Sequence, residues 1–366
     1  MKLGKTLVGL AEELSRQNET KRDFEVGSTR GISMEYNPDY TEGQEMFKMN
    51  MEVFPGGQDF PVLEKESFGI EETAHAQLAS KNNIPKKYYD IMKNEGELLA
   101  TNVNHWLHSK PQPRYIRTLD DNVRAFLSNK YRPLDNYDLA QQVLPTLHEA
   151  GIEIRSCEIT PTHMYIKGVN FELQDDIKEG DTVAMGVEIK NSEVGASSLS
   201  IMPFVERLVC TNGMRINTTD GMRKYHKGSA SMSGDDNWEV FSDKTKELTD
   251  ASVWYQVRDM TKHILSEVTL KKITHQMKES TEKKIEKDPI TAVETTCKKL
   301  NIFDAEKPDV LTHLIQGGDM SAWGMANAVT RTAQDSESYD RASELEAIGW
   351  KVVEMPHRDW QSIAVN

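Results

Sequence analysis

Apolar residues recur at helical spacing near both ends of the chain. Four leucines between residues 2 and 16 are separated by four, three and four positions, and the apolar residues between Val253 and Val268 follow a similar spacing. Such spacing places apolar side chains on one face of a helix. Segments 71–81 and 88–107 and most of the last hundred residues also predict helices, apart from a strand-like apolar tail at 350–353.

The periodicity changes in the middle of the chain. Asp135 is placed to cap a helix over 136–150 that ends at Gly151. An acidic connector is predicted at 174–181, and segment 198–209 fits a strand or a helix equally well. Strands are predicted as a pair within 115–128, turning at residues 120–122, and at 152–159, 164–169 and 182–191. We therefore expect an α+β fold, with a central, mostly antiparallel sheet and packed helices between helical N- and C-terminal regions.

At 366 residues the chain is longer than one typical domain. We predict an N-terminal region of helices and loops at 1–109, with one or two edge strands, and a helical C-terminal region at 237–366. Between them, residues 110–236 form an α+β core. The Gly, Ser and Asp content of 215–236 predicts a mobile loop with cations at its tip.

Composition restricts the class of protein. The chain is 37% hydrophobic and 28% charged, and runs of one charge sign are short, which is typical of a folded protein. No run of 18 apolar residues occurs and the start lacks a small-residue cleavage site, so we expect a soluble cytoplasmic protein without a membrane partner. Cys157, Cys210 and Cys297 fit neither a disulfide framework nor a metal knuckle.

Positive charge is segregated along this acidic chain. Segments 110–132, 203–228 and 258–287 carry +4, +3 and +3, which leaves −24 for the remaining residues of a chain whose formal net charge is −14. This separation indicates a polarised surface, although a solvated helix face explains the last segment equally well. It favours a local basic groove over a wholly basic DNA-coating face.

The first basic segment interleaves cations with aromatic side chains. Arginine binds phosphate through paired N–H groups, and aromatic rings stack unpaired bases, so this composition predicts a site for single-stranded nucleic acid. The alternative is that Arg117 and Arg124 pair with local aspartates while Tyr115, Phe126 and Tyr131 belong to the core. The candidate nucleic-acid-binding residues are Arg114, Tyr115, Arg117, Arg124, Lys130, Tyr131, Arg132, Arg223, Lys224 and Lys227.

Motifs for catalysis are absent from the sequence. It contains no GxGxxG, GxxxxGK[ST], GxSxG or HExxH pattern. His105 and His108 lack a third metal ligand, and the pairs Asp120–Asp121 and Asp235–Asp236 are explained by turns as well as by magnesium binding. We expect no enzyme, no cofactor and no metal, and keep a metal-dependent enzyme acting on nucleic acid as a minor alternative.

Six segments resemble the phage/plasmid-like protein family, which is a domain of unknown function. They are KRDF at 21–24, FGIEETAHAQLASKNNIPKKYYD from 68, NVNHWL at 102–107, RAFLSNKYRPLDNYDLAQQVLP from 124, LVCTNGM at 208–214 and NAVTRTAQDSESYDRASELEAIGWKV from 327. The resemblance implies a mobile-element protein in a bacterial host cell and implies no catalytic residues. The predicted order of helix, hairpin and third strand is also similar to the core of phage single-strand annealing recombinases, whose subunits assemble into rings or filaments.

These observations predict a non-catalytic phage or plasmid protein that binds single-stranded DNA as a homo-oligomer. Its role would be to promote strand annealing in recombination or replication. The alternative is an acidic interaction protein that occupies or inhibits a host defence or replication protein. A contiguous acidic face could compete for a basic cleft on such a partner.

Overall fold

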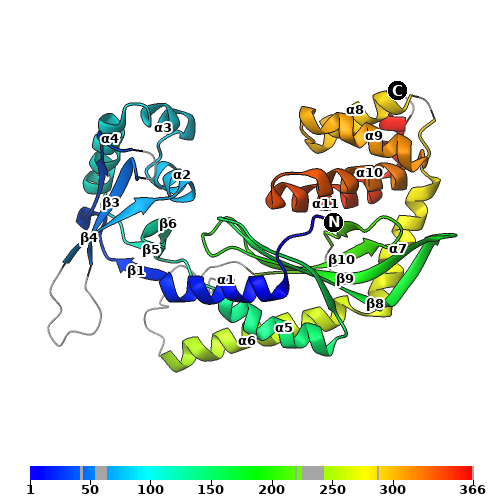
Figure 1. Ribbon diagram of the computed structural model, residues 1–366, viewed down its shortest axis with the longest axis horizontal. Coiled ribbons are helices and arrows are strands. Elements are labelled where there is room, and N and C mark those ends of the chain that lie inside the picture. Colours follow the sequence, from blue (N-terminus) through cyan, green and yellow to red (C-terminus); the bar gives the residue numbers. More distant parts are fainter. Residues whose placement is uncertain (42–43, 54–63, 219–220, 225–242, 287, 365–366) are drawn as a thin grey trace.

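The computed structural model describes residues 1–366 except 42–43, 54–63, 219–220, 225–242, 287 and 365–366, and it describes the side chains of helix 243–264 only from residue 252 onward. The described residues form an elongated molecule with two lobes, each built on a sheet with helices packed against it (Figure 1). The predicted α+β class is confirmed. No described helix has an apolar stretch long enough to cross a membrane.

The first lobe comprises residues 22–128. In its sheet the strands follow the order β1 (Arg22–Val26), β5 (Arg114–Leu119), β6 (Asn122–Ser128), β4 (Glu64–Ile70), β3 (Phe47–Val53) and β2 (Ile32–Tyr36), antiparallel except for β4 and β6. One face is covered by α2 (Glu72–Lys81), α3 (Lys86–Met92) and α4 (Gly96–Ser109). In α4, Leu99, Val103 and Leu107 are buried at intervals of four residues, which places them on one helix face.

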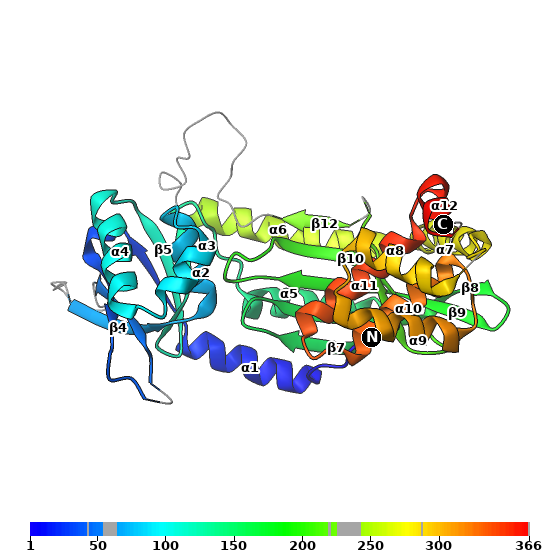
Figure 2. The same ribbon diagram turned by 90° about the horizontal axis from the view of Figure 1, so that it is seen from above.

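The second lobe contains the remaining elements. Its antiparallel sheet has the order β11 (Asn212–Arg215), β10 (Leu199–Arg207), β9 (Asp181–Asn191), β8 (Met164–Lys178) and β7 (Glu153–Ile159), and β12 (Met222–Lys224) also pairs with β10. Helices α1 (Leu7–Thr20), α5 (Asn136–Glu149) and α6 (Asp243–Ile264) lie below this sheet in Figure 1. Seen from above, α1 runs along the β7 edge (Figure 2).

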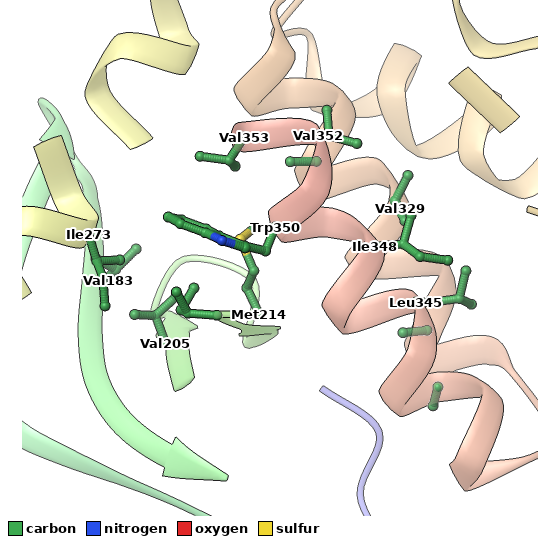
Figure 3. Packing of buried hydrophobic residues seen from close by; sticks show 14 of the residues in the cluster. Val183, Val205, Met214, Ile273, Val329, Leu345, Ile348, Trp350, Val352 and Val353 are labelled. Carbon is green, nitrogen blue, oxygen red and sulfur yellow. The ribbon is translucent and has the colours of Figure 1, made fainter. Parts of the chain in front are cut away.

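The other side of the second sheet is contacted by α7 (Glu267–Glu282), α10 (Ala322–Asp335) and α11 (Tyr339–Val353). Helices α8 (Pro289–Leu300), α9 (Lys307–Gly317) and α12 (His357–Ala364) form a further layer that packs on these helices and on one another (Figure 1). Trp350 of α11 points toward the sheet, where it meets Val205 and Met214 (Figure 3). Ile273 of α7 approaches the same cluster, so α7 and α11 share one apolar core with the sheet.

Several predicted elements are confirmed and others are wrong. The strand pair turns at Asp120 and Asp121, both with positive φ, and segment 198–209 contains a strand. Segment 174–181, predicted as an acidic connector, is mostly the second half of β8. Residues 350–353, predicted to be strand-like, form the end of α11. The long helix predicted to reach Val268 ends at Ile264. The first hundred residues contain strands β1 to β4, more than the one or two edge strands predicted. The region boundaries at 109/110 and 236/237 stay a prediction, and β5 and β6, which follow the first of them, belong to the first sheet.

A buried ionic cluster joins α11 to the second sheet. Lys167 of β8 donates to Glu346 of α11, and its Nζ lies 3.6 Å from Oε2 of Glu188 on β9; all three side chains are fully buried. Burial alone would lower the pKa of Lys167, but the two carboxylates outweigh it and raise that pKa. The helix is therefore attached to the sheet through charges as well as through apolar contacts.

Replacement of Lys167 by methionine should be strongly destabilising. The Lys167→Met change leaves Glu346 buried without its cation, and breaking such a pair lowers the free energy of unfolding by about 3–5 kcal/mol. The matched change Lys178→Met removes an exposed partner of Asp319 and should cost less than about 1 kcal/mol. Urea denaturation measures both, and equal losses in the two variants would contradict a structural role for the buried cluster.

Candidate nucleic-acid interface

The first basic segment forms the β5–β6 hairpin and the turn that follows it. Because side chains alternate along a strand, Ile116 and Phe126 face the helices of the first lobe, whereas Tyr115 and Arg117 face the opposite way. On that opposite face Tyr115 and Leu127 pack against Val194, which lies in the turn between β9 and β10. The hairpin is therefore a contact between the two lobes.

Arg117 is the centre of that contact. Its fully buried side chain donates from Nε to Asp23 Oδ1 (2.9 Å), from Nη2 to Asp135 Oδ1 (2.6 Å) and from Nη1 to the carbonyl oxygen of Glu193 (3.2 Å). Burial would lower its pKa, but the surrounding carboxylates raise it well above its usual value. Three separate segments of the chain meet at this one guanidinium.

Asp135 holds this network together and does not cap α5 through its side chain. It accepts from Arg117 and, at 2.5 Å, from Lys21 Nζ. Burial raises the pKa of its carboxyl group, but the two cations lower it more, and the resulting pKa lies below the usual value. The backbone N–H of Asn136, the first of α5, instead donates to Glu193 Oε1 at 2.6 Å.

Three more predicted binding residues take part in the lobe contact. Arg124 is buried and donates to Glu193 Oε2 at 2.7 Å. The hydroxyl groups of Tyr115 and Tyr131 donate to Asp23 Oδ2 (2.8 Å) and to the carbonyl oxygen of Glu193 (3.1 Å). Arg117, Arg124 and Tyr115 thus have partners within the protein, as the alternative to nucleic-acid binding predicts. Their carboxylate partners are Asp23, Asp135 and Glu193, and not the aspartates of the hairpin turn.

The remaining predicted residues lie in different places. Lys130 is exposed and Arg132 half-buried in the segment after β6. Arg223 is exposed and Lys224 half-buried on β12; the register puts Arg223 in one row with Ser200 and Lys190 across the second sheet. Lys227, most of the predicted loop at 215–236 and the Asp235–Asp236 pair lie outside the described residues.

Arg114 alone among the predicted residues lines a small cavity in the first lobe. This cavity, which we call the Trp106 hollow, has a volume of about 130 Å³. It is formed where α2 and α4 end and β5 begins. Its lining residues are Thr29, Lys81, Asn82, Asn83, Trp106, Lys110, Gln112 and Arg114.

The Trp106 hollow is cationic. Lys81, Lys110 and Arg114 form no ion pair within the described part of the chain, and the lining residues include no carboxylate. Arg114 is 9% exposed; Gln112 Oε1 accepts from its Nη2 at 2.8 Å, and its buried Nε has no acceptor among the described residues. Burial lowers the pKa of this guanidinium, with no carboxylate to offset the effect. The charge of the described lining residues therefore favours an anion as a ligand.

An indole ring stands at the same site. Lys110 Nζ lies 5.0 Å from the ring centroid of half-buried Trp106, whose edge contacts His105 at 5.1 Å between centroids. Aromatic faces beside cations are typical of sites that bind unpaired bases and phosphate together. Lys81, Trp106 and Lys110 are not among the residues that the sequence predicts for binding, because only the fold brings the ends of α2 and α4 together with β5.

No metal site emerges from the described residues. They contain no group of three or more histidine, cysteine or acidic side chains able to hold an ion. The Nε2 atom of His108 lies 2.8 Å from the carbonyl oxygen of Ile32, and Asp120 accepts from Arg16 at 2.7 Å. Each of these candidate ligands therefore has a structural partner.

Comparison with known proteins identifies the family. The family model described as "Domain of unknown function (DUF932)" matches residues 125–347, more than half of the chain. The chain belongs to the DUF932 family. No curated protein and no solved structure matches it. The DUF932 match runs from β6 into α11 and leaves the Trp106 hollow outside the matched residues.

The role of Asp135 can be tested through the pH dependence of stability. A carboxyl group with a lowered folded-state pKa stabilises the protein above its ordinary pKa of 3.8, and this contribution is lost as the pH falls through the lower folded value. Asp135→Asn should lower the free energy of unfolding at pH 7 by about 1.5–3 kcal/mol, the range for hydrogen bonds to charged groups. Its deficit relative to the wild type should shrink below pH 3.8.

The matched control is Asp120→Asn. This aspartate also pairs with an arginine, but both side chains are almost half exposed, so the cost should stay below about 1 kcal/mol. Urea denaturation at several pH values measures these differences. A deficit of Asp135→Asn that is unchanged between pH 7 and pH 3 would show that the ion pairs of Asp135 do not stabilise the lobe contact.

Proposed function

We propose that this protein binds single-stranded DNA without catalysing a reaction, and that the Trp106 hollow is the centre of its binding surface. The observation that supports this best is the presence, around an indole ring, of three cations that have no carboxylate partner in the described part of the chain. The proposed partner is the one expected from the sequence, but most of the proposed binding residues differ from the predicted ones. Among the predicted residues, Arg114 alone lines the hollow.

Charge pairing determines which cations can contribute to binding. Phosphate binding gains free energy when a cation releases counterions from the nucleic acid. Arg117 and Arg124 are buried against carboxylates, so contact with a phosphate would first require those ion pairs to break. Lys81, Lys110 and Arg114 have no such pairs to lose within the described residues.

The tryptophan favours a single strand over a duplex. Stacking on an indole requires a base whose face is open, and bases inside a duplex already stack on each other. Arg223 and Lys190, in one row across the second sheet, could contact a strand that continues beyond the first lobe. The family resemblance supports a setting in phage or plasmid recombination or replication in a bacterial cytoplasm. The looser topological similarity to phage single-strand annealing recombinases supports annealing of complementary strands by a homo-oligomer.

Two variants test the proposal by fluorescence anisotropy with a labelled single-stranded oligonucleotide. Trp106→Leu keeps an apolar side chain but removes the ring, and should weaken binding by about 5- to 150-fold, because one stacked base contributes about 1–3 kcal/mol. Lys81→Ala/Lys110→Ala should weaken binding and lower the slope of log affinity against log salt by about 1 for each lysine.

Lys86→Ala/Lys93→Ala is the matched control. It removes the same formal charge from the same lobe, but these lysines pair with Glu72. Affinity should stay close to that of the wild type. Equal losses in the two double variants would indicate a general charge effect and would contradict binding at the Trp106 hollow.

The alternative partner is a host protein of defence or replication. Absence of oligonucleotide binding, combined with capture of a host protein that survives nuclease treatment, would favour that alternative over DNA binding. No surface of the described residues specifically favours a host protein as the partner. The support for a host-protein partner is the net charge of −14.

A further inference from the structure

We propose that the Trp106 hollow binds a phosphate monoester, the group found at a phosphorylated strand end and in a free mononucleotide. For the phosphorylated strand end, this inference rests on the proposed function. The phosphate is the part of the ligand that enters the cavity. The base next to that phosphate would lie against Trp106.

The first argument is charge. An internal phosphodiester carries one negative charge, whereas a phosphate monoester carries about 1.5 to 2 at neutral pH because its second pKa is near 6. Lys81, Lys110 and Arg114 bring three positive charges to one cavity whose described lining offers no carboxylate. A terminal phosphate matches this concentration of charge better than a phosphodiester does.

The second argument is size. The cavity volume of about 130 Å³ corresponds to roughly four water molecules. This is below the usual range of about 300–1,000 Å³ for cavities that enclose a small organic ligand. The hollow can accept a compact tetrahedral group, and a nucleoside would remain outside at the indole ring.

The third argument is the fixed position of the Arg114 guanidinium. Gln112 Oε1 accepts from its Nη2 at 2.8 Å and the carbonyl oxygen of Pro113 accepts from its Nη1 at 3.3 Å, so the group is held at the wall of the hollow. A guanidinium that is already held in place binds phosphate with a smaller loss of side-chain entropy. The guanidinium also lies 5.6 Å from the ring centroid of Phe126, so its position is supported before a ligand binds.

The experiment compares oligonucleotides that differ only at one end. Internally labelled strands of one sequence carry a hydroxyl group at both ends, a 5′-phosphate or a 3′-phosphate, and anisotropy is measured at pH 7.5 and pH 5.5 at constant salt. We expect one phosphorylated strand to bind about tenfold more tightly than the hydroxyl strand at pH 7.5. The advantage should decrease at pH 5.5, because the monoester takes up a proton near pH 6.

Variants assign the preference to the cavity. Arg114→Lys keeps the charge but loses the planar donor group, and should remove most of the preference for the phosphorylated end; Lys81→Ala/Lys110→Ala should do the same. Lys86→Ala/Lys93→Ala should retain the preference. Thermal unfolding of each variant shows whether a lost preference comes from misfolding. If the double lysine variant does not fold, the single change Lys110→Ala, at the exposed rim of the hollow, replaces it.

The outcomes separate this inference from the proposed function. Equal affinity for all three strands, reduced by Trp106→Leu, would overturn the phosphate-monoester site and leave strand binding intact. Displacement of a bound strand by thymidine monophosphate, but not by thymidine, would support the monoester site. Binding of the monophosphate without binding of any strand would keep the site and overturn the proposed function. Lys81 and Lys110 stand at the C-terminal ends of α2 and α4, where a positive charge stabilises a helix by itself. Lysine variants that lose stability but keep the preference for the phosphorylated end would therefore also overturn the site.

Discussion

The guanidinium of Arg117 is the interaction on which the arrangement of the two lobes depends. A charge taken out of water must be matched by opposite charge at hydrogen-bonding distance, or burial becomes prohibitively costly. Asp23 supplies that charge from β1 of the same sheet, and Asp135 supplies it from the segment leading into α5 of the second lobe. Tyr115, Arg124 and Glu193 then complete a polar contact whose geometry permits little sliding of one lobe on the other.

This constraint divides the cations of the first lobe into two classes. Those near the lobe contact have carboxylate partners and maintain the structure, as the free energy of burial requires. Those at the Trp106 hollow have none among the described residues, and they lie beside an aromatic ring. In a chain with a net charge of −14, unpaired and clustered cations are the more informative class, because nearby carboxylates would otherwise neutralise them.

Local patterns predicted the elements whose signals are local. Asp120 and Asp121 indicate the hairpin turn, apolar spacing indicates α1 and α4, and Asp135 and Gly151 mark the two ends of α5. Strand β10 stayed ambiguous because nearly all its residues are buried, which removes the alternation that identifies a strand. The second half of β8 differs from the predicted connector because polar residues occupy its exposed positions and Asp175 occupies a half-buried one. Segment 350–353 differs from the predicted strand because α11 is buried on most sides.

The proposed binding site could be predicted only in part because its members are distant in sequence. Thr29, Lys81, Trp106 and Arg114 come together only when the ends of α2 and α4 meet the start of β5. Composition identified the right stretch for Arg114, but Arg117 and Arg124, which share that stretch, project toward the other lobe. Strand alternation places Arg114 and Arg117 on opposite faces of β5, and a β-bulge at Arg124 turns its side chain away from the face that carries Phe126. The distant carboxylates that neutralise Arg117 and Arg124 cannot be seen in the local sequence.

In the proposed complex, nucleic acid contacts the first lobe at Trp106 and not at the buried arginines. Photo-crosslinking of a 5-iodouracil-substituted single strand, followed by peptide mapping, shows where the strand lies. We expect crosslinks on the peptide that contains Trp106 and their loss in Trp106→Leu. Crosslinks confined to the strands of the second sheet, with none on the Trp106 peptide, would contradict it.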